Sequence, residues 1–280
     1  MTRIRSLALT ASLAIALTGC STTPSATPHD SADPFAHAHG IVADTRGDVF
    51  IATHTGIFSL SRDGVLAGPI GGNDFDAMGL TITGDTLLAS GHPGTSTPPQ
   101  LGAPNLGVIR SDDHGKSWSP VALTGTTDFH SLTAGSDGTL YGIPSGATVL
   151  LRSSDDGRTW LEAPPIAAVG LAATRNGLYA ATQEGLKLST DQGQSFQLVK
   201  DAPLLYKIAV RADGTLVGID TDGAIWTQET NGTWKRGASI QGAAQALGGG
   251  DDGRVVIVDD RGVVQVMPDG KTIRSSTAAG

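Results

Sequence analysis

The chain has 280 residues, of which 39% are hydrophobic and 16% charged, and its formal net charge is −8. An acidic chain without a basic stripe is unsuited to binding nucleic acid, or anionic lipid headgroups by charge alone. Its 38 glycines favour many short strands joined by tight turns over long helices.

The first segment has the features of an export signal. Arg3 and Arg5 precede an apolar run, residues 7–17, that is too short to cross a bilayer as a permanent helix. The run ends in Leu17-Thr18-Gly19-Cys20, which resembles the lipobox of bacterial lipoproteins. The resemblance implies a signal peptide over 1–19, acylation of Cys20, and a lipid anchor on an extracytoplasmic bacterial membrane surface. The alternative is an ordinary secretory signal with a chance cysteine.

Residues 20–34 are predicted to be a flexible tether, because their Ser, Thr, Pro and Ala cannot bury enough apolar surface to fold. Residues 35–280 are predicted to be one domain. Cys20 is the only cysteine, so this domain has no internal disulfide and depends on its core for stability. We expect a monomer.

Six similar units follow one another in the domain, and each contains alternating apolar positions interrupted by Gly-containing turns. This pattern predicts antiparallel hairpins within every unit. The hairpins are expected over residues 40–60, 79–91, 131–143, 170–188, 208–226 and 246–266, within units at 37–73, 74–125, 126–167, 168–203, 204–240 and 241–275. One unit cannot bury both faces of its sheet, so the units must stack around an axis.

An octet of the pattern Ser-x-Asp-x-Gly-x-(Ser/Thr)-aromatic occurs at residues 111–118, 153–160 and 189–196, with an eroded copy at 227–234. Ser111, Ser153 and Ser189 are spaced by 42 and 36 residues, a period typical of β-propellers with four-stranded blades. We therefore predict an all-β fold, a six-bladed β-propeller of four-stranded antiparallel blades. Seven blades is the main alternative, and a parallel β-helix is disfavoured because its coils are shorter than these units.

The octets resemble the Asp-box, or BNR repeat, of sialidase-like propellers. The resemblance implies that each octet forms the turn between the third and fourth strands of a blade. The Asp would accept backbone N–H bonds, the Gly would adopt a positive φ, and the aromatic ring would pack between sheets. The structural positions are then Asp113, Gly115, Trp118, Asp155, Gly157, Trp160, Asp191, Gly193 and Phe196.

Functional residues are expected at the opposite face from the octets. There the start of the innermost strand meets the end of the second strand, at a mouth of the central channel. Three of the expected strand starts carry His37-Ala38-His39, Asp76-Ala77-Met78 and Asp128-Phe129-His130, and two strand ends carry His54 and His92. The later units have Val169, Tyr206 and Gln183 in comparable places, and no histidine follows position 130.

Imidazole, thioether and carboxylate groups are metal-ligand types, so this sector is a candidate transition-metal site. Copper is the favoured ion and zinc the second choice, and a small organic ligand in a hydrogen-bonded pocket is the alternative. The candidate ligands are His37, His39, His54, Asp76, Met78, His92, Asp128 and His130.

The same stretches resemble the serial motifs of bacterial exported BNR-repeat proteins often labelled sialidase-like or glycosylhydrolase. The resemblance covers roughly residues 37–200 and implies roles for His39, His54, Met78, His92, Asp128 and His130. A sialidase-like glycoside hydrolase is therefore one alternative function, and an assembly scaffold is another. Sialidase chemistry also requires an arginine cluster and a Tyr–Glu pair, which the sequence does not offer convincingly. A different hydrolase using Asp76, Asp128 or Glu184 stays open.

An insertion at residues 94–105 follows His92. Its Pro and Gly content predicts an irregular loop, either a lid over the histidine sector or a plain surface loop.

Overall fold

In the computed structural model, residues 33–35, 37–250 and 252–277 are described. The predicted signal peptide, Cys20 and most of the predicted tether lie outside the described residues. Residues 33 onward belong to one compact unit. Within the described part of the chain, no helix is long and apolar enough to cross a membrane.

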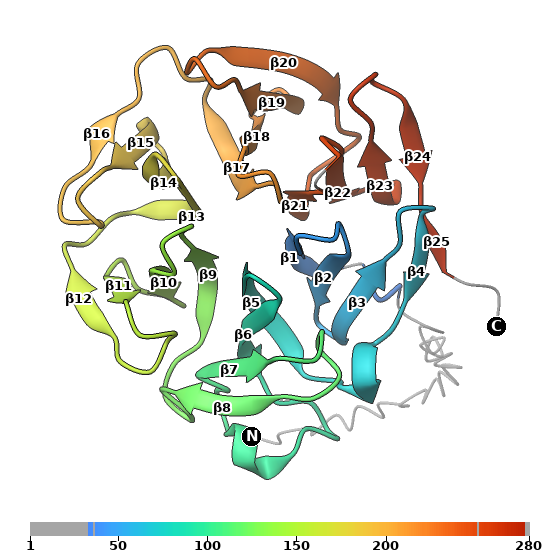
Figure 1. Ribbon diagram of the computed structural model, residues 1–280, viewed down its shortest axis with the longest axis vertical. Coiled ribbons are helices and arrows are strands. Elements are labelled where there is room, and N and C mark those ends of the chain that lie inside the picture. The colour runs from blue at the N-terminus through green and yellow to red at the C-terminus, as the bar shows by residue number, and fades with distance from the viewer. Residues whose placement is uncertain (1–32, 36, 251, 278–280) are drawn as a thin grey trace, which may run out of the picture. The chain divides into compact units, whose positions relative to one another are not determined.

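The chain forms six sheets in sequence order, and each has its earliest strand innermost (Figure 1). The first three blades contain β1 (Ala38–Ala43), β2 (Val49–Thr53), β3 (Gly56–Leu60) and β4 (Val65–Ala67); then β5 (Asp76–Thr83), β6 (Thr86–His92), β7 (Val108–Ser111) and β8 (Ser119–Ala122); then β9 (Phe129–Ala134), β10 (Leu140–Pro144), β11 (Leu150–Ser153) and β12 (Leu161–Ala163). Two short 3-10 helices, η1 (Ile70–Gly72) and η2 (Pro99–Leu101), lie in the connections around blade two.

The last three blades repeat this order. They contain β13 (Ala168–Thr174), β14 (Gly177–Thr182), β15 (Gly185–Ser189) and β16 (Gln197–Leu198); then β17 (Leu205–Val210), β18 (Leu216–Asp220), β19 (Ala224–Gln228) and β20 (Trp234–Ser239); then β21 (Ala246–Gly249), β22 (Val255–Asp259), β23 (Gly262–Val266) and β24 (Thr272–Arg274). Each innermost strand contacts the innermost strands of both neighbouring blades, and β21 contacts β1. The prediction of a six-bladed β-propeller is confirmed.

The three octets connect the third and fourth strands of blades two, three and four. In the second octet the Asp155 carboxylate accepts bonds from the Thr159 amide at 2.9 Å and the Thr159 hydroxyl at 2.7 Å. The Ser153 hydroxyl accepts a bond from the Gly157 amide at 3.0 Å. The other two octets repeat these bonds. The turn contains two consecutive residues of positive φ, such as Asp156 and Gly157. Of these two positions, the sequence pattern specifies only the glycine.

The octet aromatics pack against the core formed with the preceding blade. The Trp118 ring lies edge-on to Phe75, with ring centroids 5.4 Å apart, and the Trp160 ring lies 4.9 Å from Phe129. Phe196 packs against the cluster that blades three and four share. Each turn therefore also helps to join neighbouring blades.

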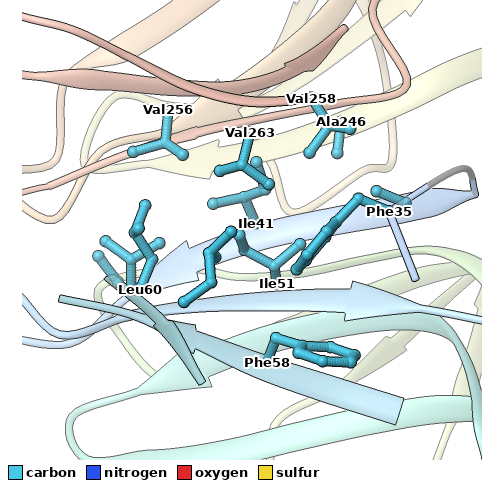
Figure 2. Packing of buried hydrophobic residues seen from close by; sticks show 13 residues of the cluster. Phe35, Ile41, Ile51, Phe58, Leu60, Ala246, Val256, Val258 and Val263 are labelled. Carbon is cyan, nitrogen blue, oxygen red and sulfur yellow. The ribbon is translucent and has the colours of Figure 1, made fainter. Parts of the chain in front are cut away.

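The ring closes where the first and last blades meet. Phe35, Ile41 and Ile51 of the first blade pack against Val256, Val258 and Val263 of the last (Figure 2). A final strand, β25 (Ser276–Thr277), pairs in parallel with β4 at the outer edge of blade one (Figure 1). Apolar side chains therefore fill the interior of the joint between blades one and six. At its outer edge, the last described segment of the chain returns to blade one and forms backbone hydrogen bonds there.

Arg254 adds a polar bond to this closure. Its side chain is 1% exposed, and its guanidinium donates to the Gly47 carbonyl at 2.9 Å and to Gln265 Oε1 at 2.8 Å. Gly47 belongs to blade one, whereas Arg254 and Gln265 belong to blade six. The two acceptor oxygens and the Asp252 carboxylate, whose Oδ1 lies 3.6 Å from Arg254 Nε, stabilise the buried charge, although Nε itself has no hydrogen-bond partner among the described residues.

Candidate metal site

A backbone irregularity recurs near the start of the innermost strand in the first five blades. The pairing with the second strand skips one residue, which is His39, Met78, His130, Val169 and Tyr206 in blades one to five. A β-bulge of this kind redirects the side chain of the extra residue. The bulges therefore give one equivalent position in each of five blades around the channel mouth, and only blades one to three fill it with metal-ligand side chains.

The pairing of the first two strands in a blade places the end of the second strand beside the bulge near the start of the first. Asp76 on β5 is the direct partner of His92 on β6, and His54 follows Thr53, the partner of Ala38. Gly91 makes the close approach in blade two possible, since its φ is +149° and a Cβ there would lie 1.9 Å from the Asp76 carbonyl oxygen. The expected meeting of strand starts and strand ends is thus present in the structure.

The first cluster consists of His39, His54 and Asp76. The His54 Nδ1–H donates to Asp76 Oδ2 at 2.7 Å, and His39 Nε2 lies 3.7 Å from Asp76 Oδ1. Both His39 Nε2 and Asp76 Oδ1 are buried atoms without a hydrogen-bond partner. Burial, reinforced by the charge that His54 can carry, lowers the pKa of His39 to about 4. His39 is therefore a neutral imidazole at pH 7, the form that binds metal ions.

The second cluster consists of His92, Asp128 and His130. Asp128 Oδ2 lies 2.7 Å from His130 Nε2 and 3.3 Å from His92 Nε2, and the Asp128 side chain is 6% exposed. Although these atoms are close, neither oxygen of Asp128 receives a bond of acceptable hydrogen-bond geometry from any residue that the structure describes. The buried Asp128 carboxylate thus faces two imidazole nitrogens, neither of which donates a hydrogen bond to it.

His92 is held in one tautomer by its other nitrogen. Its Nδ1 lies 3.3 Å from the Pro104 carbonyl oxygen, which can only accept a hydrogen bond, so Nδ1 carries the proton. In the neutral ring, Nε2 then presents a lone pair toward the Asp128 carboxylate. A histidine oriented by a backbone carbonyl on its far nitrogen is the usual arrangement of a metal ligand.

Each cluster brings its three ligand atoms within 4.8 Å of one another. Six of the eight predicted ligands therefore assemble, as two groups of two imidazoles and one carboxylate. Met78 lines the same cavity, which has a volume of about 500 Å³ and also contains His54, Asp76, His92, Asp128 and His130. His37 belongs to neither cluster; its ring lies edge-on to that of His54, with centroids 4.9 Å apart.

The insertion after His92 forms part of the cavity wall. Asp74 anchors it, because its carboxylate accepts bonds from Thr95 Oγ1 and the Ser96 amide, both at 2.9 Å. The amide of Ser96 is the main reason that the pKa of Asp74 is lowered to about 2. At its far end, Asn105 lines the cavity and donates to the Thr126 carbonyl at 3.2 Å. In the structure, hydrogen bonds hold the loop near both of its ends.

Lys207 is a residue of this region that the sequence analysis did not single out. It lies on β17 next to the bulge and lines the central channel of about 670 Å³, which His39, Met78 and His130 also line. Burial lowers the pKa of Lys207, and its ammonium donates to the Gln245 carbonyl at 2.6 Å. The available signal was a single Lys in the otherwise apolar strand LYKIAV.

No family model matches the chain, and no curated protein matches it either. Solved structures that match include a virginiamycin B lyase from Staphylococcus aureus, with 16% identity and a TM-score of 0.50 over 86% of this chain and 84% of that one. A gluconolactonase from Xanthomonas campestris matches with 13% identity and a TM-score of 0.60, over 82% and 85%. A GH74 xyloglucanase from the same organism matches with 16% identity and a TM-score of 0.53 over 86% of this chain, which spans only 45% of the enzyme. At these identities the likeness shows the fold alone.

Proposed function

We propose that the protein is a lipid-anchored, extracytoplasmic binding protein that holds a transition-metal ion at the channel mouth of blades one to three. One observation carries the proposal. Asp128 is buried, faces two imidazole nitrogens at 2.7 and 3.3 Å, and receives no hydrogen bond from either. A buried carboxylate without donors costs free energy unless a cation compensates it.

The alternative to a metal is a proton on one of the imidazoles. A protonated His92 or His130 would donate to Asp128 along a nearly linear N–H···O bond, which is the strongest geometry for such a pair. The contacts lack that geometry although their lengths would permit it. The side chains of the second cluster therefore approach one another without bonding, as metal ligands do, whereas in the first cluster a metal ion would replace the bond between His54 and Asp76.

The donor set favours copper and then zinc. Neutral imidazoles with the Met78 thioether suit copper, and two imidazoles with one carboxylate and a free position suit zinc. In a metal-binding protein outside the cytoplasm, ligation without thiolate would leave no cysteine at the site to be oxidised by copper.

We also propose that the octets are Asp-boxes of the BNR type. The hydrogen bonds of the Asp155 turn and its repetition in three blades support this assignment. A sialidase reaction gains little support from the tyrosines, because Tyr141 and Tyr179 are 5% and 2% exposed and belong to core clusters, and the Tyr206 hydroxyl accepts a bond from the Ala244 amide at 3.3 Å. The two buried rings are not placed to act as a nucleophile on a sugar, and neither Tyr206 nor any arginine is among the described residues that line the cavity of about 500 Å³.

The test is calorimetric titration of the metal-free domain with Cu²⁺ and Zn²⁺. The double variant His39→Ala/His130→Ala removes one ligand from each cluster, and His114→Ala serves as the matched control because its ring stacks on Phe50, outside both clusters. We expect tight binding by the wild type and the control, and none by the double variant, with equal circular dichroism spectra for all three. Equal, weak binding by the wild type and the double variant would show that the sector is not a metal site.

A further inference from the structure

The ligands form two matched clusters rather than one. His39, His54 and Asp76 come from blades one and two, and His92, Asp128 and His130 come from blades two and three. Each cluster has the same composition, and its three ligand atoms lie within 4.8 Å of one another. Three ligands from the protein leave one position of a four-coordinate ion open.

The two clusters share one cavity. Asp76 of the first cluster and His92 of the second are direct partners across β5 and β6, a placement that brings Cβ atoms within about 5.5 Å. Both residues line the same cavity of about 500 Å³. His39 of the first cluster and His130 of the second also line the central channel together. Open positions on two ions would therefore face one common space.

The charges of this cavity do not balance for two ions. Among the described residues that line it, Asp76 and Asp128 are the only acidic ones, and none is Lys or Arg. Two divalent ions would bring four positive charges against two carboxylates, so an anion is needed to neutralise the remainder. The rest of the wall offers neutral hydrogen-bonding groups, among them Asn105, Thr126, Thr127 and Ser145. Their hydroxyl and amide groups are suited to donate to the oxygens of such an anion.

We propose that the protein binds two divalent metal ions, one in each cluster, and that these ions together bind an oxyanion of the phosphate type. The inference rests on the proposed metal-binding function and extends it to a second ion and a ligand class. Phosphate fits because its several anionic oxygens can contact both ions at once, as in other two-metal sites. A cavity of about 500 Å³ is also large enough for a small phosphate monoester.

The first experiment measures metal stoichiometry. The domain is loaded with zinc, freed of excess metal by gel filtration, and analysed for zinc by elemental analysis. We expect two zinc ions per chain in the wild type and in His114→Ala, and one in each of His54→Ala and His92→Ala. The variants Asp76→Asn and Asp128→Asn repeat the comparison with smaller changes, in case an alanine variant fails to fold.

The second experiment measures anion binding. The zinc-loaded proteins are titrated calorimetrically with inorganic phosphate, phenyl phosphate and acetate. We expect phosphate to bind the wild type at least tenfold more tightly than acetate does, and to bind either one-zinc variant at least tenfold more weakly. The metal-free wild type should not bind phosphate. Phenyl phosphate binding as tightly as phosphate identifies a monoester as the ligand type, and much weaker binding identifies the free anion.

The outcomes separate the two proposals. If no zinc or copper binds, the proposed function fails and this inference fails with it. If one zinc binds to the wild type and is lost in both single-cluster variants, the metal site stands and the second ion is refuted. If two ions bind but phosphate binds no better than acetate, the oxyanion proposal is refuted while both metal sites remain.

Discussion

Asp128 lies in an environment that is unfavourable for a carboxylate with a purely structural role. It is 6% exposed, and neither carboxylate oxygen receives a hydrogen bond within the described structure. The octet residue Asp155 is the opposite case, since hydrogen bonds from the backbone and side chain of Thr159 lower its pKa to about 2. The same residue type is thus stabilised at one position and left without donors at the other. Binding sites commonly sacrifice stability in this way.

The first prediction concerns this difference. Asp128→Asn removes the buried negative charge with little change in shape, so the metal-free variant should melt at the same temperature as the wild type or higher. Its affinity for zinc in the second cluster should fall at least tenfold, because a carboxylate ligand is lost. Calorimetric melting and zinc titration measure the two effects. A lower melting temperature with unchanged zinc affinity would identify Asp128 as a structural residue.

At the scale of the element, the octet turn makes stability depend on pH. The folded pKa of Asp155 is about 2, below the value of 3.8 for an unperturbed carboxyl, so the folded state holds this proton less tightly. The contribution to stability is complete above the unfolded value and is lost as the pH falls from there toward 2. Asp113 and Asp191 behave in the same way, because the hydroxyls of Ser117 and Ser195 lower their pKa values to about 2.

The second prediction follows from this turn. Asp155→Ala removes the acceptor for the Thr159 amide and hydroxyl, so the melting temperature at pH 7 should fall and its loss between pH 4 and pH 2 should be less steep. The control is Asp156→Asn, because Asp156 forms only an exposed pair with Arg158 and Asn tolerates its positive φ. Zinc affinity should be unchanged in both. A loss of zinc affinity at an unchanged melting temperature would contradict a structural role for the octet.

The sequence was sufficient to predict the strand hairpins and the place of the octets. Each hairpin turn sets its own register, so Asp76 and His92 could be expected at one strand end before the fold was known. The bulges could not be foreseen, because the residue that is skipped depends on packing against the next blade. His37, two residues before His39, contacts the same His54 ring as His39 does, with ring centroids 4.9 and 4.6 Å apart. The separation into two clusters likewise depends on contacts between blades that are distant in sequence.

At the scale of the whole molecule, the ring depends on the joint between blades one and six. Arg254 is the polar centre of that joint. Its guanidinium donates to the Gly47 and Arg62 carbonyls of blade one and to the Gln265 side chain of blade six, and it lies 3.6 Å from Asp252. Without the guanidinium, the Gly47 and Gln265 acceptors would be left buried. Two contacts would then remain at the joint: the apolar packing of Phe35 and Ile41 against Val258 and Val263 (Figure 2), and the pairing of β25 with β4.

The third prediction tests this joint. Arg254→Met keeps an unbranched side chain of moderate length but removes the donors, and it should lower the free energy of unfolding by about 1–3 kcal/mol for each buried acceptor left unsatisfied. Arg158→Met is the control, since the Arg158 side chain is 63% exposed, and its effect should stay within about 0.5 kcal/mol. Urea unfolding measures both. Equal effects of the two substitutions would show that closure does not depend on Arg254.

The fourth prediction concerns the anchor, which lies outside the described residues. If Cys20 is acylated, the chain should partition with membranes, because acyl chains bury many methylene groups in the bilayer. Cys20→Ser should release the protein into the soluble fraction or leave its signal peptide attached. Fractionation and intact mass spectrometry measure this change. An unchanged mass and an unchanged membrane fraction in the variant would contradict lipidation.

The bulge recurs in five blades, but in blades four and five its residue is not one of the candidate metal ligands. Val169 occupies the bulge of blade four, on the inner strand next to that of His130, and is 66% exposed. An exposed aliphatic side chain contributes little to the core, so Val169→His should be tolerated with little loss of stability. The same backbone would then aim another imidazole at the channel mouth. Coordination could in this way be extended around the ring one blade at a time, by point substitution and without redesign of the scaffold.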